Sequence, residues 1–288
     1  MDVTRRVFAA IAAAGAMIVA AGAPAQDFPS KPVRILVGYA PGGPLDSVTR
    51  ALSPKLTDEL RQPVVVENRP GASGVIACEV VARSPADGYT LILQGITHSL
   101  LPALKSDLPF DTAKDFTAVG LVGHGALIVV VPASLPVKTL ADFIALAKSQ
   151  PGRFSYASAG NGTSLHVAVE MLKKSAGLDL VHVPYKGSAP AIADVIGGRV
   201  QMMMDVVPSA LPHVKAGTLR PLAVTGGKRL ADLPDVPTMI ESGYPEADFV
   251  TWWGIFGPAK MPPATVRTLN AAINRAVASP DVRARIAA

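Results

Sequence analysis

The segment from Ser155 to His166 has residue types and a spacing suited to binding an anion. A short apolar run is followed by two glycines and then by Thr163 or Ser164, either of which can cap the amphipathic helix predicted over 165–176. The unpaired N–H groups at the start of a helix carry a partial positive charge. The segment therefore predicts an anion site built from backbone amides, which requires no lysine or arginine.

A second segment, from Tyr39 to Arg50, has the same order of features. An apolar run leads through glycines to the polar start of a helix predicted over 46–60. Ligands of open α/β sheets bind outside the carboxyl ends of the strands. We therefore predict that the two segments form opposing halves of one cleft. Asp46 fits a helix cap, with contact to a positively charged ligand group as the alternative.

Other reactive patterns are weak in this sequence. Ser158 in YASAG resembles a hydrolase nucleophile elbow, but Tyr156 stands where the G-x-S-x-G pattern has its first glycine. The histidines form no H-x-x-x-H pair, and neither glycine segment has the GK[ST] ending of a P-loop or a full dinucleotide fingerprint. We therefore expect a binding protein and no enzyme, with no metal and no cofactor.

Alternating strand and helix patterns predict how the chain positions these segments. A series of strands and helices runs over 32–97 and a second one over 140–225, while two apolar runs between Phe116 and Pro132 have no helix between them. This pattern is typical of an α/β protein with two lobes, parallel sheets and a hinge between the lobes. The alternative is one large doubly wound domain. The predicted boundaries are 27–123 together with 230–288 for lobe 1, and 124–229 for lobe 2.

Composition and charge limit the possible partners. The chain has 288 residues, of which 49% are hydrophobic and 17% charged, as in a well-buried globular protein. The net charge of +5 is scattered along the chain and only 5% of residues are aromatic, so no nucleic-acid surface is predicted. A single cysteine, Cys78, excludes an internal disulfide.

The first residues predict export. Arg5 and Arg6 precede an apolar run that ends at Ala21, and Ala23-Pro24-Ala25 supplies a small-residue cleavage site. We therefore predict a signal peptide over 1–25 and a periplasmic mature protein. The two arginines fit either a twin-arginine signal or an ordinary secretory one.

Seven stretches, in order along nearly all of the mature chain, resemble the motif set of the Bug proteins, the substrate-binding components of tripartite tricarboxylate transporters. They are PSKPVRILVGYAPGGPLDSVTR, VVVENRPGASG, DGYTLIL, SYASAGNGTSLH, VHVPYKGSAPA, DVVPSALPHVKAG and LPDVPTMIESG. The resemblance implies a periplasmic binding protein of the type II-like, Venus flytrap fold. It further implies a small organic acid as ligand, held through its carboxylate by backbone amides and ordered water, a monomer, and membrane transporter subunits as partners.

Carried over position by position, the resemblance implies ligand contacts from both lobes. GITH over 95–98 is a looser match to the family than the other stretches. Asp205 follows an apolar strand, where it either lines the cleft or caps the next helix. The ligand-binding residues predicted in this way are Pro41, Gly42, Gly43, Pro44, Asp46, Thr97, His98, Ser158, Ala159, Gly160, Asn161, Gly162, Thr163, Ser164 and Asp205.

Two further expectations come with the resemblance. Family members continue through another strand and helix, so we expect the sequence that stops at Ala288 to be a fragment or a truncated product. The same fold also serves as a ligand-sensing module for a membrane sensor kinase. The sequence does not separate delivery to a transporter from sensing, because both need only a surface that changes with the ligand.

Overall fold

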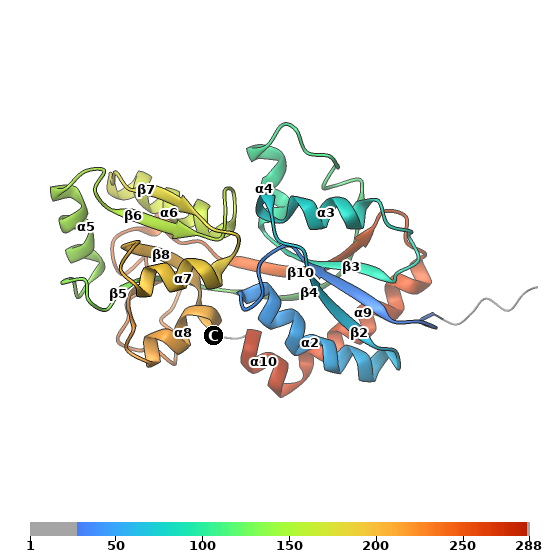
Figure 1. The fold of residues 1–288 in the computed structure, drawn as a ribbon. Helices are drawn as coiled ribbons and strands as arrows, with labels where there is room; N and C mark the ends of the chain where they lie inside the picture. Colours follow the sequence, from blue (N-terminus) through green and yellow to red (C-terminus); the bar gives the residue numbers. More distant parts are fainter. Residues whose placement is uncertain (1–27, 287–288) are drawn as a thin grey trace, which may run out of the picture.

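Two five-stranded sheets organise the chain, and each is covered by helices (Figure 1). The structure is a computed structural model and describes residues 28–286, so the predicted signal peptide lies outside the described residues. The strand order is β2-β1-β3-β10-β4 in the first sheet and β7-β6-β8-β5-β9 in the second. The two orders are equivalent, because in both the last two strands carry the chain between the lobes.

The first lobe is built on strands rich in β-branched residues, which favour a buried sheet. Strand β1 pairs in parallel with β2 and β3, while β10 pairs antiparallel with β3 and β4. The strands are β1 (Val33–Val37), β2 (Val64–Asn68), β3 (Thr90–Gly95), β4 (Phe116–Gly125) and β10 (Thr251–Pro258). The helices are α2 (Pro44–Leu60), η1 (Ala72–Gly74), α3 (Val75–Ala82), α4 (Thr97–Leu104), α9 (Pro263–Ala278) and α10 (Pro280–Ile286).

The second lobe repeats this plan. Strand β6 pairs in parallel with β7 and β8, while β5 pairs antiparallel with β8 and β9. The strands are β5 (Leu127–Pro132), β6 (Ser155–Ser158), β7 (Val181–Pro184), β8 (Met202–Val206) and β9 (Leu219–Val224). The helices are α5 (Leu140–Ser149), α6 (Ser164–Ala176), α7 (Ser188–Ile196) and α8 (Val207–Lys215). The short helix η2 (Pro245–Ala247) lies between β9 and β10.

The predicted parallel pairing is confirmed for the βαβ part of each sheet, but the strands that cross between the lobes depart from it. Strands β5 and β10 each enter a sheet directly from the other lobe, without the crossover helix that a parallel connection requires, and both run antiparallel to their neighbours. All six residues of β5 are buried, as expected of a strand covered on both faces. Each sheet is therefore mixed, with a parallel βαβ part that ends at the cleft.

Residues 230–250 contact elements of the second lobe, at β9 and α6. Thr238 bridges to Val224 at the end of β9, and η2 packs against α6. The predicted boundaries stay a prediction. These contacts lead us to propose that the return falls near Thr251, with residues 230–250 in lobe 2 instead of lobe 1.

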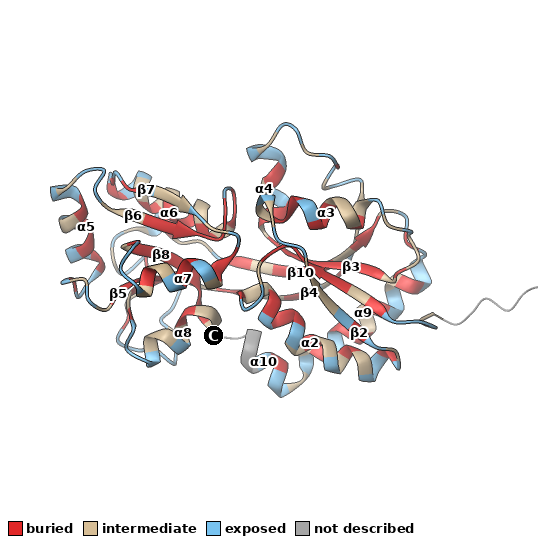
Figure 2. Ribbon diagram, viewed as in Figure 1, coloured by how far each residue is buried: buried red, intermediate tan, exposed pale blue. Residues whose placement is uncertain are grey.

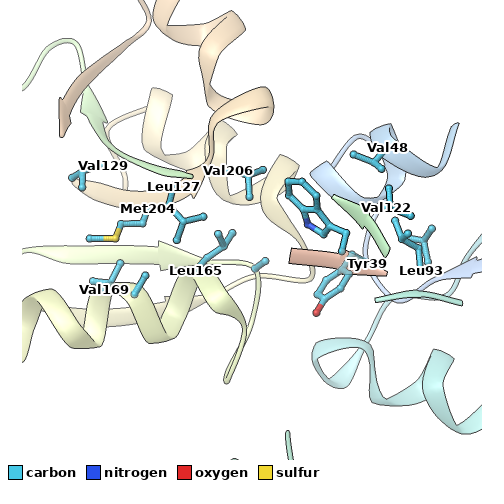
Figure 3. Close-up of a cluster of buried hydrophobic side chains, with 14 of the residues drawn as sticks. Tyr39, Val48, Leu93, Val122, Leu127, Val129, Leu165, Val169, Met204 and Val206 are labelled. Atoms are coloured by element: carbon cyan, nitrogen blue, oxygen red, sulfur yellow. The ribbon is translucent and has the colours of Figure 1, made fainter. Parts of the chain in front are cut away.

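Buried side chains continue from one lobe into the other. Figure 2 shows the buried residues along the strands of both sheets, and one apolar cluster includes residues of both. In Figure 3 this cluster runs from Val129 and Met204 in the second lobe to Leu93 and Val122 in the first. Burial of this apolar surface favours contact between the lobes. The structure therefore describes an arrangement in which the lobes meet.

Candidate ligand-binding site

A pocket between the two lobes is lined by the first residues of several helices. Helix α2 contributes Pro44, α4 contributes Thr97, α6 contributes Ser164 and α7 contributes Ser188. The side chain of Trp253 from β10 forms part of the same wall. The full lining is Tyr39, Pro44, Leu45, Gly95, Thr97, Ala159, Thr163, Ser164, Leu165, Ser188, Val206, Thr251 and Trp253.

The charge available to a ligand comes from the backbone. None of the residues that line the pocket is a lysine or an arginine. Among the described residues, no acceptor hydrogen-bonds the N–H groups of Ser164 and Leu165, the first two positions of α6. Free N–H groups at a helix start attract anions through the partial charge of the helix dipole. The pocket is therefore suited to a negatively charged group.

The loop before α6 is held by short polar contacts. Ser158 Oγ accepts a hydrogen bond from the N–H of Gly160 at 3.1 Å, and Thr163 Oγ1 donates to the Gly160 carbonyl at 2.8 Å. The N–H of Gly162 donates to Nδ1 of His166 at 3.1 Å. Thr163 is the N-cap, and its Oγ1 accepts from the His166 N–H. The predicted helix start is thus confirmed, and each turn of the loop is fixed.

Two glycines are required in this loop. Gly162 has φ +75°, and a Cβ there would lie 2.7 Å from Cδ1 of Leu104 in the other lobe. Gly160 has φ +131°, and a Cβ there would lie 2.8 Å from Oγ of Ser73. Residues with a side chain rarely adopt such φ values. The glycines therefore permit both the turn and the close approach of the lobes.

Two histidines and a tyrosine stack behind the loop. The ring centroids of His166 and His182 are 4.2 Å apart, and those of Tyr156 and His182 are 4.8 Å apart. Nε2 of His182 lies 2.6 Å from Ser158 Oγ. Burial, with the nearby His166, lowers the pKa of His182 to about 4. The imidazole is therefore neutral at neutral pH, and its Nε2 can accept a hydrogen bond from the Ser158 hydroxyl.

The same contacts explain why Ser158 does not stand in the pocket. Its side chain is fully buried, and its Oγ is shared between His182 and the Gly160 backbone. A nucleophile must reach the bound substrate. Ser158 therefore braces the loop, and its predicted ligand contact stays a prediction.

Asp46 holds the corresponding loop of the first lobe. Its buried carboxylate accepts from the N–H of Gly42 at 2.9 Å, from Nε of Arg50 at 3.0 Å and from Nδ2 of Asn68 at 2.8 Å. Burial alone would raise the pKa of Asp46, but these hydrogen bonds outweigh it and the pKa lies below its usual range. Asp46 is the third residue of α2, whose N-cap is Gly43, and its carboxylate bonds back to the loop at Gly42. The predicted ligand contact of Asp46 stays a prediction.

Thr97 and His98 are the first two residues of helix α4. Thr97 lines the pocket. The imidazole of His98 instead packs against Phe116 and Phe256, with ring centroids 4.7 and 5.0 Å away. Its Nε2 lies 3.3 Å from the carbonyl oxygen of Thr112. The His98 ring therefore fills an apolar cluster and does not line this pocket, and its predicted ligand contact stays a prediction.

Asp205 is fully buried behind the pocket wall. Its carboxylate accepts from the hydroxyl of Ser188 and from the N–H of Val206 at 2.8 Å. Both partners line the pocket, while Asp205 does not. The structure thus puts a carboxylate one hydrogen bond behind the surface that a ligand would touch.

The other predicted residues divide between the pocket and its rim. Pro44, Thr97, Ala159, Thr163 and Ser164 line the pocket. Ala159, Gly160 and Asn161 also line a neighbouring hollow between the lobes. Pro41 is exposed, and a Cβ added at Gly42 or Gly43 would lie within 4 Å of helix α7. The lining residues that the sequence analysis missed are Tyr39, Leu45, Gly95, Leu165, Ser188, Val206, Thr251 and Trp253.

Two hydrogen bonds join the lobes at the rim. The N–H of Ala40 donates to the carbonyl of Lys186 at 3.0 Å, and Ser73 Oγ donates to the carbonyl of Asn161 at 2.6 Å. Ala40 and Ser73 belong to the first lobe, and their partners belong to the second. These bonds and the shared apolar cluster hold the two loops across one pocket.

Within residues 28–286, no group of three or more His, Cys, Asp or Glu side chains is arranged to hold a metal ion. No helix in that same range combines the length and the apolar character needed to cross a membrane.

Two α/β lobes with a pocket between them, reached by helix starts from both sides, define a two-lobe solute-binding protein. The family of tripartite tricarboxylate transporter family receptors (TctC) matches residues 48–288, and the chain belongs to this family. The predicted family and fold class are thus confirmed. The chain is a solute-binding receptor of a family that serves transporters and whose members are periplasmic.

Two relatives cover nearly the whole chain. The UPF0065 protein in the tcbD-tcbE intergenic region of Pseudomonas sp. (strain P51) is 38% identical over 279 residues, which are 96% of this chain and 83% of that protein. Protein BugT of Bordetella pertussis is 37% identical over 274 residues, 94% of this chain and 83% of BugT.

Solved structures show the same fold. The periplasmic binding protein BugD matches with a TM-score of 0.87 at 33% identity over 90% of this chain and 86% of that one. MatC from Rhodopseudomonas palustris with bound malate matches with a TM-score of 0.86 at 33% identity over 90% and 88%. An R. palustris protein with adipate matches with a TM-score of 0.85 at 34% identity over 88% and 85%.

Proposed function

We propose that this chain captures a small organic acid in the periplasm and delivers it to the membrane subunits of a tripartite tricarboxylate-type transporter. The observation that carries the proposal is the pocket between the lobes, which several helix starts face and which no lysine or arginine lines. Such a pocket binds a carboxylate through N–H groups and excludes most other charged ligands. Malate and adipate in two similar structures support the same class of ligand.

The proposed contacts are main-chain groups of the two loops. The N–H groups of Ser164 and Leu165 face the carboxylate from the second lobe, and the start of α2 at Pro44 and Leu45 closes over it from the first. The ligand stabilises the closed arrangement only by as much as its contacts there exceed those in the open one. We propose binding without a catalytic step, since Ser158 is buried and already bonded.

Calorimetry with malate, with adipate and with their diamides tests the carboxylate contact. Charged hydrogen bonds contribute about twice as much as neutral ones, so the diamides are expected to bind roughly 30- to 100-fold more weakly. Mass spectrometry of small molecules released from denatured purified protein would identify the native acid. Equal affinity for acid and diamide, or a copurified ligand without a carboxylate, would contradict the proposal.

Export and partners need separate measurements. We propose removal of the signal peptide after Ala25 and a monomeric mature protein, which intact mass and light scattering of the exported protein test. Capture of membrane proteins on immobilised protein, with and without malate, tests delivery to a transporter. Ligand-dependent capture of a sensor kinase instead of transporter subunits would show that the chain is a sensing module.

A further inference from the structure

The carboxylate of Asp205 is buried without a compensating cation. Asp205 is the last residue but one of β8, and its side chain has no exposed surface. Its hydrogen-bond partners are neutral: the Ser188 and Ser209 hydroxyls and the Val206 N–H. In the part of the chain that the structure describes, no lysine, arginine or histidine pairs with it. A buried carboxylate with only neutral partners is held less well as an anion than one paired with a cation.

Ser188 connects this carboxylate to the pocket. It is the first residue of α7 and is part of the pocket lining, and its hydroxyl donates to Asp205. A serine hydroxyl has one proton to donate. While Asp205 is ionised, that proton is committed to the carboxylate and the hydroxyl can only accept. An ionised Asp205 therefore presents an acceptor to the pocket at a point where an anionic ligand needs a donor.

We propose that binding of a carboxylate ligand is coupled to the uptake of one proton by Asp205, and that the hydroxyl of Ser188 transmits the coupling. The inference rests on the proposed function, since it concerns the same pocket and the same class of ligand. It adds a proton as a second component of binding and names the two side chains responsible.

The coupling follows from the balance of charges and donors. A ligand carboxylate brings a second negative charge close to Asp205 in a pocket without side-chain cations, where repulsion is poorly screened. When a proton from solvent adds to one carboxylate oxygen of Asp205, the repulsion ends. The new O–H of Asp205 donates to Ser188 Oγ, and the Ser188 O–H turns to donate to the ligand. The proton returns to solvent when the ligand leaves.

Compared with Tyr39 and the two histidines behind the α6 loop, Asp205 is the titratable group that changes its protonation near neutral pH. Burial raises the pKa of Asp205 to about 6, in spite of the hydrogen bonds from Ser188, Ser209 and the Val206 N–H. Burial also raises the pKa of Tyr39, which lines the pocket from the first lobe, so this phenol stays protonated. Burial lowers the pKa values of His166 and His182 behind the α6 loop, so these rings stay neutral. From β5, the partner of Asp205 is the apolar Ile128.

Calorimetry of malate and adipate binding in buffers of different ionisation enthalpy counts the protons directly. At about pH 7.5 both the ligands and free Asp205 are ionised, so wild-type protein is expected to take up about one proton per ligand. Its affinity should then fall about tenfold for each pH unit of increase. Asp205→Asn should bind with no proton uptake and with an affinity that does not change over this pH range. Asp232→Asn, an exposed carboxylate of the same lobe, is the matched control and should behave as wild type.

Each outcome bears on one proposal. Wild-type binding without proton uptake, or uptake that persists in Asp205→Asn, would overturn the coupling and leave carboxylate binding intact. Failure of the wild type to bind malate, adipate or any other carboxylate would instead contradict the proposed function. If Asp205→Asn does not fold, the proton count and the pH dependence of the wild type still decide. Ser188→Ala gives a second measure, because it keeps the carboxylate and is expected to weaken binding and lower the uptake.

Discussion

The two loops that face each other across the pocket are built alike but are braced by different chemistry. In the first lobe the carboxylate of Asp46 joins Gly42, Arg50 and Asn68 into one charged network. In the second lobe the acceptors are neutral groups. The Ser158 hydroxyl accepts from the N–H of Gly160, and the His166 imidazole accepts from the N–H of Gly162. Both arrangements fix N–H groups of a glycine turn before a helix. The two arrangements differ in the pH at which protonation of the acceptor would break their hydrogen bonds.

This difference in acceptors predicts which loop loses its hydrogen bonds first as pH falls. A carboxylate that accepts several hydrogen bonds stays ionised well below neutral pH, so the first loop is insensitive to mild acid. A neutral imidazole that accepts a proton loses its acceptor nitrogen, so the second loop depends on His166 and His182 staying neutral. In the described part of the chain, the second loop also leads into the N–H groups of Ser164 and Leu165, which have no acceptor. A disturbance of the second loop is therefore expected to weaken ligand binding more than a disturbance of the first.

The largest effect is expected from Gly162→Val. A β-branched residue at φ +75° is strained by about 1–2 kcal/mol, and its side chain would press on Leu104 of the facing lobe. We expect malate or adipate affinity to fall roughly 30- to 100-fold, measured by calorimetry.

Gly177→Val is the matched control. Gly177 follows the same helix at φ +62°, and among the described residues nothing beyond its chain neighbours lies within 4 Å of its Cβ position, so this variant should lose stability and keep its affinity. Normal binding by Gly162→Val would show that the second loop does not hold the ligand.

A smaller effect is expected from Asp46→Ala. Removal of the carboxylate leaves the Gly42 N–H, Arg50 and Asn68 without their acceptor. We expect the free energy of unfolding to fall by ~1–2 kcal/mol and affinity to fall about fivefold. Thermal unfolding and calorimetry measure the two losses. Asp58→Ala, an exposed carboxylate on the same helix, should change neither, and equal losses in both variants would mean that the network does not brace the loop.

The sequence predicted the architecture well because local patterns determined it. Runs of β-branched residues followed by Gly and a polar helix start gave the strand-to-helix turns at Gly43 and Thr163, and the apolar runs around Gly125 indicated the crossing between lobes. The direction of the crossing strands could not be predicted in this way. Whether β10 runs parallel or antiparallel to β3 depends on the lobe from which the chain arrives, and no local pattern encodes it.

The site was predicted in part, and the predicted ligand contacts stay a prediction. Ser188 could have been found, because Gly187-Ser188 repeats the glycine and hydroxyl residues at the start of α6, Gly162-Thr163-Ser164. Trp253 and Thr251 carry no such signal, because a residue from a crossing strand reaches the pocket only through the tertiary fold. The packing of the His98 ring against Phe116 and Phe256 could not be predicted, because these residues are distant in sequence and meet only in the folded protein.

Acid is expected to loosen the second loop before the first. The pKa of His182 is about 4 in the folded protein against an ordinary value of 6.5, so the unfolded state binds more protons between these values. The stability from neutral His182 is therefore complete above about pH 6.5 and is lost as pH falls toward 4. For Asp46 the loss begins only near its ordinary value of 3.8 and continues below it.

Amide exchange followed by NMR measures both loops in one experiment. Protection of the Gly160 and Gly162 amides should fall between about pH 6 and 4, after correction for the intrinsic exchange rate, while the Gly42 amide keeps its protection. Parallel loss at all three amides would mean that the lobes open together and that the two braces do not act separately.

The smallest effect is expected from Lys186→Ala, which tests whether a side-chain cation adds to the backbone amides. Lys186 lies in the hollow beside Asn161 and does not line the ligand pocket. Its contact across the lobes is made by its carbonyl, which accepts from the Ala40 N–H and which alanine retains. Lys186 is exposed, and an exposed ammonium contributes little in water, so we expect affinity for malate and adipate to change less than about threefold, with a slightly weaker salt dependence. Calorimetry at low and high salt measures both. A loss in Lys186→Ala as large as that in Gly162→Val would mean that a cation, and not the amides of the second loop, holds the ligand.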